Sequence, residues 1–217
     1  MIITEQKPLE KILESLKEYT KIFLVGCGEC STSCKTGGEK EVIQLKDALE
    51  RNGKRVVGFV IPKAPCIASQ VKMEFAKNRK ALEEAEVILS LTCGLGAQSV
   101  KENDRLGHEV IPGCNTVCMG VMDAQGNFFE RCSACGECVL DITGGICPIT
   151  LCPKSLLNGP CGGMDKGKCE VDKERDCVWV LIYKELEKRK KLDALKKIQK
   201  PKDFQKATKP HKLIMAK

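Results

Sequence analysis

Aromatic residues, histidines and long apolar runs are all scarce in this sequence. Aromatic side chains make up only 4% of the 217 residues, so the hydrophobic core must be built from aliphatic side chains. The two histidines, His108 and His211, lie outside any readable Ser-His-Asp or Cys-His pattern, which argues against those hydrolytic enzymes. No apolar stretch reaches the length of a membrane helix, so we expect no membrane span.

The N-terminus also lacks the features of a secretory signal. Residues 1–16 contain neither an apolar core segment nor a small-residue cleavage site. We therefore expect a cytoplasmic protein, in which thiols stay reduced. Cysteine is abundant, with 15 residues. Because this number is odd and the compartment is reducing, ligation of a metal or a cluster is favoured over a disulfide framework.

The order of the predicted elements indicates an α/β fold. Helical periodicity alternates with short apolar runs through the first half of the chain. Strands are expected at residues 21–25, 54–61, 86–91 and 108–112, and helices at residues 8–19, 39–53, 71–85 and 97–107. This alternation predicts a small parallel sheet with flanking helices and right-handed crossovers.

The periodic pattern stops near residue 122, where a cysteine-rich segment dominated by loops begins. Three parts are predicted: an α/β domain (1–122), a domain that binds a cluster or a metal (123–177), and a C-terminal helix with a basic tail (178–217). The middle part shows too little periodicity to bury a core of its own. We therefore expect a bound metal to hold it together.

In the first half of the chain, every cysteine follows the carboxyl end of a predicted strand. These ends share one edge of a parallel sheet, where ligands bind, so cysteines distant in sequence should meet there. Three thiols of the first loop and one of a later loop are the expected ligands of an iron–sulfur cluster: Cys27, Cys30, Cys34 and Cys93. For Cys66, Cys114 and Cys118, which lack a C-x2-C partner, a role as small buried side chains is equally consistent.

The second cysteine set begins like a ferredoxin motif. Cys132, Cys135 and Cys138 have the spacing of the first three ligands in the bacterial run C-x2-C-x2-C-x3-C-P. The sequence then departs from that run, because eight residues rather than three separate Cys138 from Cys147. Eight cysteines match the ligand number of two four-iron clusters, although one cluster with several structural thiols also fits: Cys132, Cys135, Cys138, Cys147, Cys152, Cys161, Cys169 and Cys177.

Zinc is the alternative metal for this second set of cysteines. A zinc ribbon usually pairs one C-x2-C with a second C-x2-C, and no second one follows Cys138. The spacing therefore favours an iron–sulfur cluster, and zinc in the C-terminal set stays open.

Several longer strings carry a resemblance to a known family. They include "VGCGECSTSCKTGGEKEV", "LTCGLGAQSV" and "CSACGECVLDITGGICPITLCPKSLLNGPCGG". The chain resembles the small subunit, or C-terminal domain, of bacterial and archaeal methylenetetrahydrofolate reductase, which is described as iron–sulfur or zinc-finger-like. The resemblance implies a catalytic partner that is a TIM-barrel flavoprotein and carries the FMN or FAD.

The resemblance implies an electron-transfer subunit rather than a catalyst. Two [4Fe-4S] clusters, or three, would pass electrons to or from the partner's flavin, and a further donor subunit or a ferredoxin would supply them. The alternative function is a zinc-stabilised scaffold that holds the reductase complex together without redox work.

The C-terminal tail is strongly basic. Residues 184–217 contain 13 Lys and Arg against 4 Asp and Glu, and no nucleic-acid recognition motif accompanies them. We interpret the tail as an arm that docks on the catalytic subunit, and a solvated end is the alternative. Four apolar residues are the expected anchors: Phe204, Leu213, Ile214 and Met215.

Overall fold

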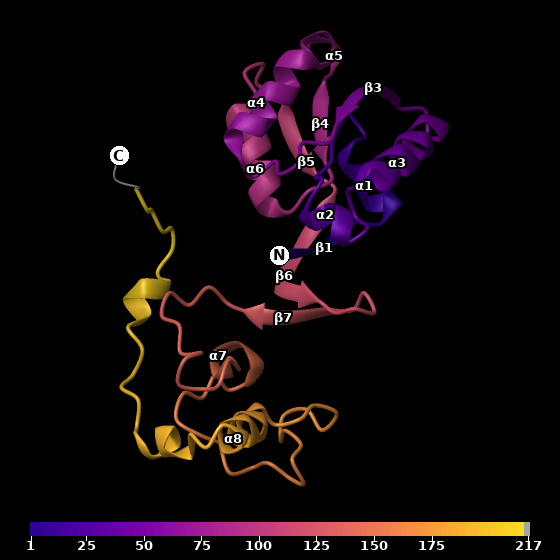
Figure 1. The fold of residues 1–217 in the computed structure, drawn as a ribbon. Coiled ribbons are helices and arrows are strands. Elements are labelled where there is room, and N and C mark those ends of the chain that lie inside the picture. The colour runs from indigo at the N-terminus through magenta and orange to yellow at the C-terminus, as the bar shows by residue number, and fades with distance from the viewer. Residues whose placement is uncertain (215–217) are drawn as a thin grey trace. The chain divides into compact units, whose positions relative to one another are not determined.

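The computed structural model describes residues 1–214 and divides the chain into two compact units, Met1–Cys118 and the part from Met119 onward (Figure 1). The first unit contains a four-stranded parallel sheet in the order β3-β2-β4-β5. Its strands are β2 (Lys21–Val25), β3 (Arg55–Val60), β4 (Val87–Ser90) and β5 (Glu109–Pro112). The predicted α/β architecture is confirmed, with helices flanking this parallel sheet.

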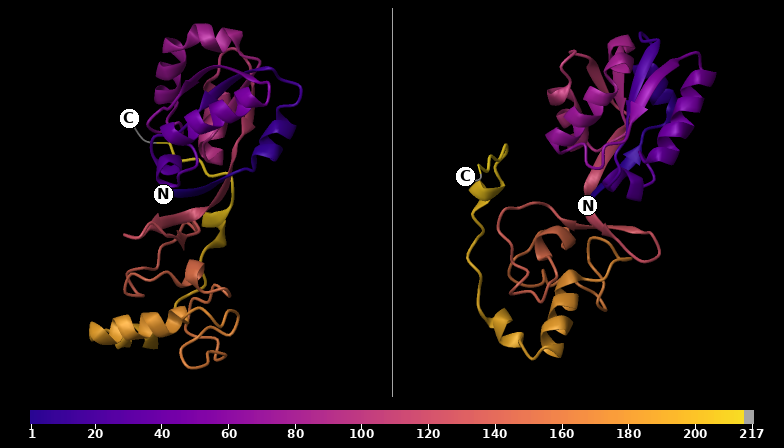
Figure 2. Two further views of the ribbon diagram at one scale, coloured as in Figure 1. Left: turned by 90° about the vertical axis from the view of Figure 1, so that its right-hand side faces the viewer. Right: turned by 45° about the horizontal axis from the view of Figure 1, so that its top comes forward.

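Helices cover both faces of the sheet (Figure 2). One face packs against α1 (Leu9–Ser15) and α3 (Glu39–Arg51), and the other packs against α4 (Ala68–Lys77), α5 (Arg79–Glu84) and α6 (Gly94–Asn103). Successive strand residues point to opposite faces: Ile22 and Leu24 lie in the first core, whereas Phe23 and Val25 lie in the second. A strand buried on both faces reads as a continuous apolar run, which made β2 predictable.

The structure divides one predicted helix in two and adds three strands to the prediction. The helix expected at residues 71–85 is two helices, because Asn78 ends α4 and begins α5. A second sheet, in the order β1-β6-β7, consists of β1 (Ile2–Gln6), β6 (Cys114–Met122) and β7 (Phe128–Cys132). Strands β6 and β7 form an antiparallel hairpin. All five residues of β7 are exposed, so its sequence has no apolar alternation to reveal it.

The second unit has a small core and little regular structure. Besides the end of β6 and the whole of β7 it contains α7 (Pro148–Leu151), α8 (Val178–Lys188) and two 3₁₀ turns, η1 (Leu192–Lys196) and η2 (Phe204–Ala207). Five buried residues form its core: Cys177, Val178, Trp179, Ile182 and Leu186. The expected C-terminal helix ends at Lys188, because Lys190 adopts a left-handed backbone conformation with φ of 54°.

Within residues 1–214, no helix is both long and apolar enough to cross a membrane.

Candidate functional site

Three neighbouring strands bring cysteines to one edge of the first unit's sheet. Cys27 follows β2, Cys66 follows β3 and Cys93 follows β4. Strand β2 lies between β3 and β4, so the three loops start side by side. This edge is the one where open parallel sheets bind ligands.

Backbone hydrogen bonds tie the first cysteine loop to the loop after β3. The Gly28 N–H donates to the Pro62 carbonyl oxygen at 3.0 Å. Within the first loop itself, the Cys27 N–H donates to the Gly37 carbonyl oxygen at 2.8 Å. A Cβ atom on Gly28 would lie 3.2 Å from the Lys63 Cα. Glycine therefore allows the loop that carries Cys27 to approach the loop that carries Cys66.

The thiols at this edge interact electrostatically. Cys27 and Cys93 are buried, Cys30 is partly buried and Cys66 is exposed. Partial burial raises the pKa of the Cys66 thiol, and the nearby Cys93, Cys27 and Cys30 thiolates raise it further. Each of these contributions comes from a thiol that lies near Cys66. Cys66 therefore has three of the four cysteines that were expected at this site as neighbours.

The fourth assigned cysteine, Cys34, has different neighbours. Its Sγ atom lies 3.8 Å from the Ile2 carbonyl oxygen, whereas the Ile2 N–H donates to the Cys30 sulfur at 3.4 Å. Cys34 also contributes to the electrostatic environment of Cys114. Burial raises the pKa of Cys114 to about 12, with smaller contributions from Cys93 and Cys34. The Cys114 thiol packs in the first aliphatic core, and Cys118 is partly buried within β6.

A buried hydroxyl beside these cysteines has no hydrogen-bond partner among residues 1–214. Ser31 lies in α2 (Cys30–Ser33) and is fully buried. Its Oγ atom makes no hydrogen bond within the part of the chain that the structure describes. A buried polar atom of this kind needs an explanation. A bound group that accepts hydrogen bonds, as the sulfides of an iron–sulfur cluster do, would provide one.

In the second unit, the ferredoxin-like loop carries a charged partner for its central thiol. The loop begins at Cys132, where β7 ends, and turns through left-handed conformations at Ala134 and Gly136, with φ of 52° and 77°. The Lys202 ammonium donates a hydrogen bond to the Cys135 sulfur at 3.0 Å. This contact lowers the pKa of Cys135 and so favours the thiolate, the form that binds metals.

An N–H group also points at the first sulfur of this loop. The Ala134 N–H donates to the Cys132 sulfur at 3.4 Å. Donors that face sulfur are the surroundings in which cluster-bound thiolates are stabilised. The donor set around the loop therefore fits an iron–sulfur cluster. Cys138 is exposed, and the partly buried Cys147 donates to the Thr150 hydroxyl at 3.6 Å.

The other four cysteines of the second unit line one small cavity of about 20 Å³: Cys152, Cys161, Cys169 and Cys177. Backbone bonds hold the segment that carries them, since the Cys169 N–H donates to the Arg175 carbonyl oxygen and the Cys177 N–H to the Gly167 carbonyl oxygen. Four thiols around one cavity are the ligand number of a zinc site or of a cluster. The sequence analysis treated all eight cysteines of this unit as one set. The last four are regularly spaced, with seven or eight residues between neighbours, and this feature could have separated them from the first four.

Across residues 1–214, no three His, Cys, Asp or Glu side chains are arranged to hold a single metal ion.

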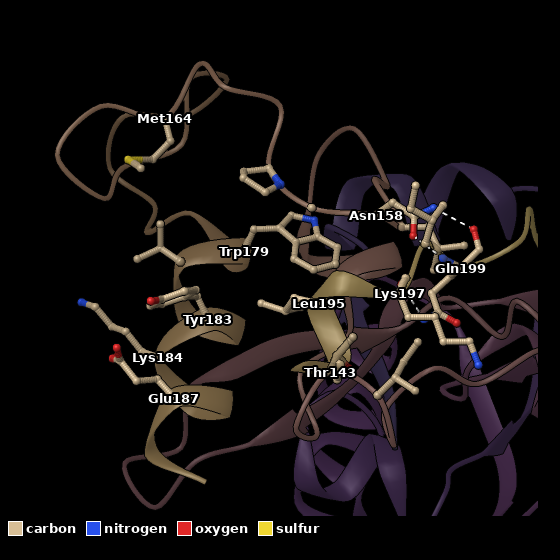
Figure 3. A pocket seen from close by; sticks show the side chains of 17 residues that line it. Thr143, Asn158, Met164, Trp179, Tyr183, Lys184, Glu187, Leu195, Lys197 and Gln199 are labelled. Carbon is tan, nitrogen blue, oxygen red and sulfur yellow. Dashed lines mark hydrogen bonds between the residues drawn. The ribbon is translucent and has the colours of Figure 1, made fainter. Parts of the chain in front are cut away.

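A larger apolar cavity of about 610 Å³ lies beside α8, between Trp179, Tyr183 and Leu195 (Figure 3). The Trp179 indole N–H donates to the Leu156 carbonyl oxygen at 3.1 Å, so this buried ring is fixed. No cysteine lines the cavity.

The tail residues also contribute to the cysteine site, which the sequence did not reveal. Lys202 is buried against the Cys132–Cys138 loop. Of the expected apolar anchors, Phe204, Leu213 and Ile214 are exposed, and Met215 lies outside the described residues.

The comparison with known families supports one part of the resemblance, the relation to a reductase C-terminal domain. Residues 111–205 match the family described as "Methylene-tetrahydrofolate reductase C terminal". The match covers less than half of the chain and includes every cysteine from Cys114 to Cys177. No curated protein and no solved structure matches the chain.

Proposed function

We propose that this chain is an electron-transfer subunit of a methylenetetrahydrofolate reductase complex. It passes electrons through [4Fe-4S] clusters to or from the flavin of a catalytic partner. The family match over residues 111–205 supports the relation to the reductase. The observation that carries the redox proposal is that thiols distant in sequence follow three adjacent strands of the parallel sheet and line one cavity of the second unit.

Three sets of thiols would hold the clusters, in line with the two or three expected. At the sheet edge they are Cys27, Cys30 and Cys93, with Cys34 or Cys66 as the fourth ligand. In the second unit one set is Cys132, Cys135, Cys138 and Cys147, and the other is Cys152, Cys161, Cys169 and Cys177. When bound, a four-iron cluster supplies a one-electron carrier whose potential depends on hydrogen bonds to sulfur and on exposure to solvent.

The protein's own groups would set the surroundings of these carriers. Burial of Cys27 and Cys93 keeps water from one side of the sheet-edge site. The Ser31 hydroxyl supplies a donor that is unpaired within the described part of the chain, and Lys202 supplies a positive charge at the second site. Charge and donors at sulfur favour the reduced form of a carrier.

The flavin and folate sites belong in the partner. A TIM barrel has eight parallel strands, whereas the parallel sheet of this chain has four. The chain would therefore associate with a flavin-containing catalytic subunit. A ferredoxin or a further subunit would act as the donor.

A zinc-stabilised scaffold is the second candidate function. The observation that favours it is that four cysteines are among the residues lining one cavity, because four thiols are the ligand number of a structural zinc site. The second unit also has a core of only five buried residues, and a structural zinc would stabilise so small a core.

Metal analysis of the protein isolated without oxygen separates the two functions. The electron-transfer proposal predicts a brown protein with iron and acid-labile sulfide in equal amounts, at eight or more irons per chain, and dithionite should bleach it. A colourless protein with zinc alone would support the scaffold and contradict the proposal.

A further inference from the structure

A segment of the C-terminal tail, residues 199–206, packs against the Cys132–Cys138 loop, and we name it the strap. Its first residue is fixed by two bonds to one side chain (Figure 3). The Gln199 N–H donates to the Asn158 Oδ1 at 2.7 Å, and the Asn158 Nδ2 donates to the Gln199 carbonyl oxygen at 2.9 Å. At the other end, the Lys206 ammonium lies 3.0 Å from the Glu137 Oε1. Side chains therefore hold both ends of the strap.

The middle of the strap places a charge directly at a sulfur. Lys202 is only 9% exposed, which is rare for a lysine unless its charge has partners. Its ammonium donates to the Cys135 sulfur at 3.0 Å and also to the Glu137 carbonyl oxygen. These acceptors compensate for the loss of water around the charge, so Lys202 is held at the sulfur rather than merely near it.

Glu137, between Cys135 and Cys138, binds the strap through both of its carboxylate oxygens. Its Oε1 accepts from the Lys206 ammonium, and its Oε2 accepts from the Asp203 N–H at 3.0 Å. These two contacts join Glu137 to two residues of the strap.

The backbone of the loop is shaped to accept the strap. Gly136 has a φ of +77°, and a Cβ atom at this position would lie 2.3 Å from the Lys206 carbonyl oxygen. Any other residue would clash with the strap backbone. The glycine that follows Cys135, within the second C-x2-C step, thus permits the close approach.

We propose that the strap positions the Cys132–Cys138 loop and that Lys202 raises the reduction potential of the cluster bound there. A positive charge at a ligand sulfur stabilises the reduced, more negative cluster more than the oxidised one. The part concerning the potential rests on the proposed electron-transfer function. The part concerning the strap rests on the contacts alone.

A redox titration of the full chain, followed by electron paramagnetic resonance, tests the role of the charge. Lys202→Met should lower the midpoint potential of one cluster by about 59 mV. This shift corresponds to a tenfold change in the equilibrium constant for transfer of one electron. Lys202→Arg keeps the charge and should restore the potential. Lys200→Met removes an exposed lysine two positions away and should change nothing. A Lys202→Met protein with full iron and an unchanged potential overturns the proposal.

Hydrogen exchange of the full chain tests the strap whatever metal is bound. Lys202→Met and Glu137→Ala should each speed exchange at amides 132–138 several-fold, and Lys200→Met should not. Unchanged exchange in both variants overturns the strap. A wild-type chain that contains zinc and no sulfide would contradict both the electron-transfer function and the effect on the potential. Hydrogen exchange at amides 132–138 would still test whether the strap positions the loop.

Discussion

The Lys202 ammonium lies 3.0 Å from the Cys135 sulfur, although 67 residues separate the two in sequence. The basic tail is therefore part of the cysteine site over residues 199–206. Only the residues beyond the strap are available as the arm that the sequence suggests.

Two truncations should separate the strap from the docking arm. Deleting residues 207–217 should leave the bound metal unchanged but weaken association with the catalytic subunit, because Leu213 and Ile214 are 87% and 75% exposed. Deleting residues 199–217 should also lower the metal content, since it removes Lys202. Metal analysis and titration with the partner measure the two effects. If both truncated proteins keep the metal content and the partner affinity of the full chain, neither segment acts as described.

Serine variants should identify the fourth ligand at the sheet edge. The electrostatic contact of Cys66 with Cys93, Cys27 and Cys30 leads us to expect that Cys66→Ser removes about one cluster's iron and sulfide per chain. Cys34→Ser should retain most of both, because its sulfur lies beside the Ile2 carbonyl oxygen. Loss of iron in Cys34→Ser but not in Cys66→Ser would restore the ligand set expected from the sequence.

Loss of a ligand at the cysteine-lined cavity should destabilise the second unit. Cys169→Ser should lower its free energy of unfolding by more than about 4 kcal/mol, as loss of a metal site does. Trp179, the single tryptophan of the chain, lines this cavity, so its fluorescence reports the unfolding. Glu174→Gln, in the same exposed loop, is the matched control. An unchanged midpoint in Cys169→Ser argues against a metal at this cavity.

Glu86 should make the first unit sensitive to acid. Its carboxylate accepts from the Thr20 and Lys21 N–H groups at 2.6 and 3.1 Å, and these bonds lower its pKa from the ordinary value of 4.5. A carboxylate whose pKa is lowered by folding stabilises the folded state at pH values above its unfolded pKa. This contribution is lost as the pH falls through the lower pKa of the folded state. Glu86→Gln should therefore melt below wild type near pH 7 and converge with it near pH 3.

The control for this prediction is Glu102→Gln, which alters another exposed carboxylate of the same unit. Thermal melts of Glu102→Gln should follow wild type at both pH values. A constant difference between Glu86→Gln and wild type across this range would show that the hydrogen-bonded carboxylate is not the cause.

The parallel sheet was predictable because its strands are short, buried on both faces and separated by helices with clear periodicity. Residues 22–25 of β2 are all buried, which leaves an uninterrupted apolar run. The sheet that contains β1, β6 and β7 was not predictable in this way. The pairing of β1 with β6 joins residues far apart in sequence, and β7 presents no buried face.

The candidate site was predictable only in its residue types. Strand ends indicated where Cys27 and Cys93 would meet, because that rule depends on topology. Cys66 could not be assigned to this site from the sequence. It lies in the loop after β3, and no second cysteine at C-x2-C spacing accompanies it. Lys202 could not be predicted, because nothing local distinguishes it from the 12 other basic residues of the segment 184–217.

Anaerobic rapid mixing of this chain with the flavin-bearing catalytic subunit tests the central claim most directly. The chain is first reduced, freed of excess dithionite and then mixed with the oxidised partner while both chromophores are recorded. The account predicts that the cluster absorption returns as the flavin bleaches, with one flavin reduced for every two electrons released. A flavin that stays oxidised beside reduced clusters, in a complex shown to be intact, would contradict it.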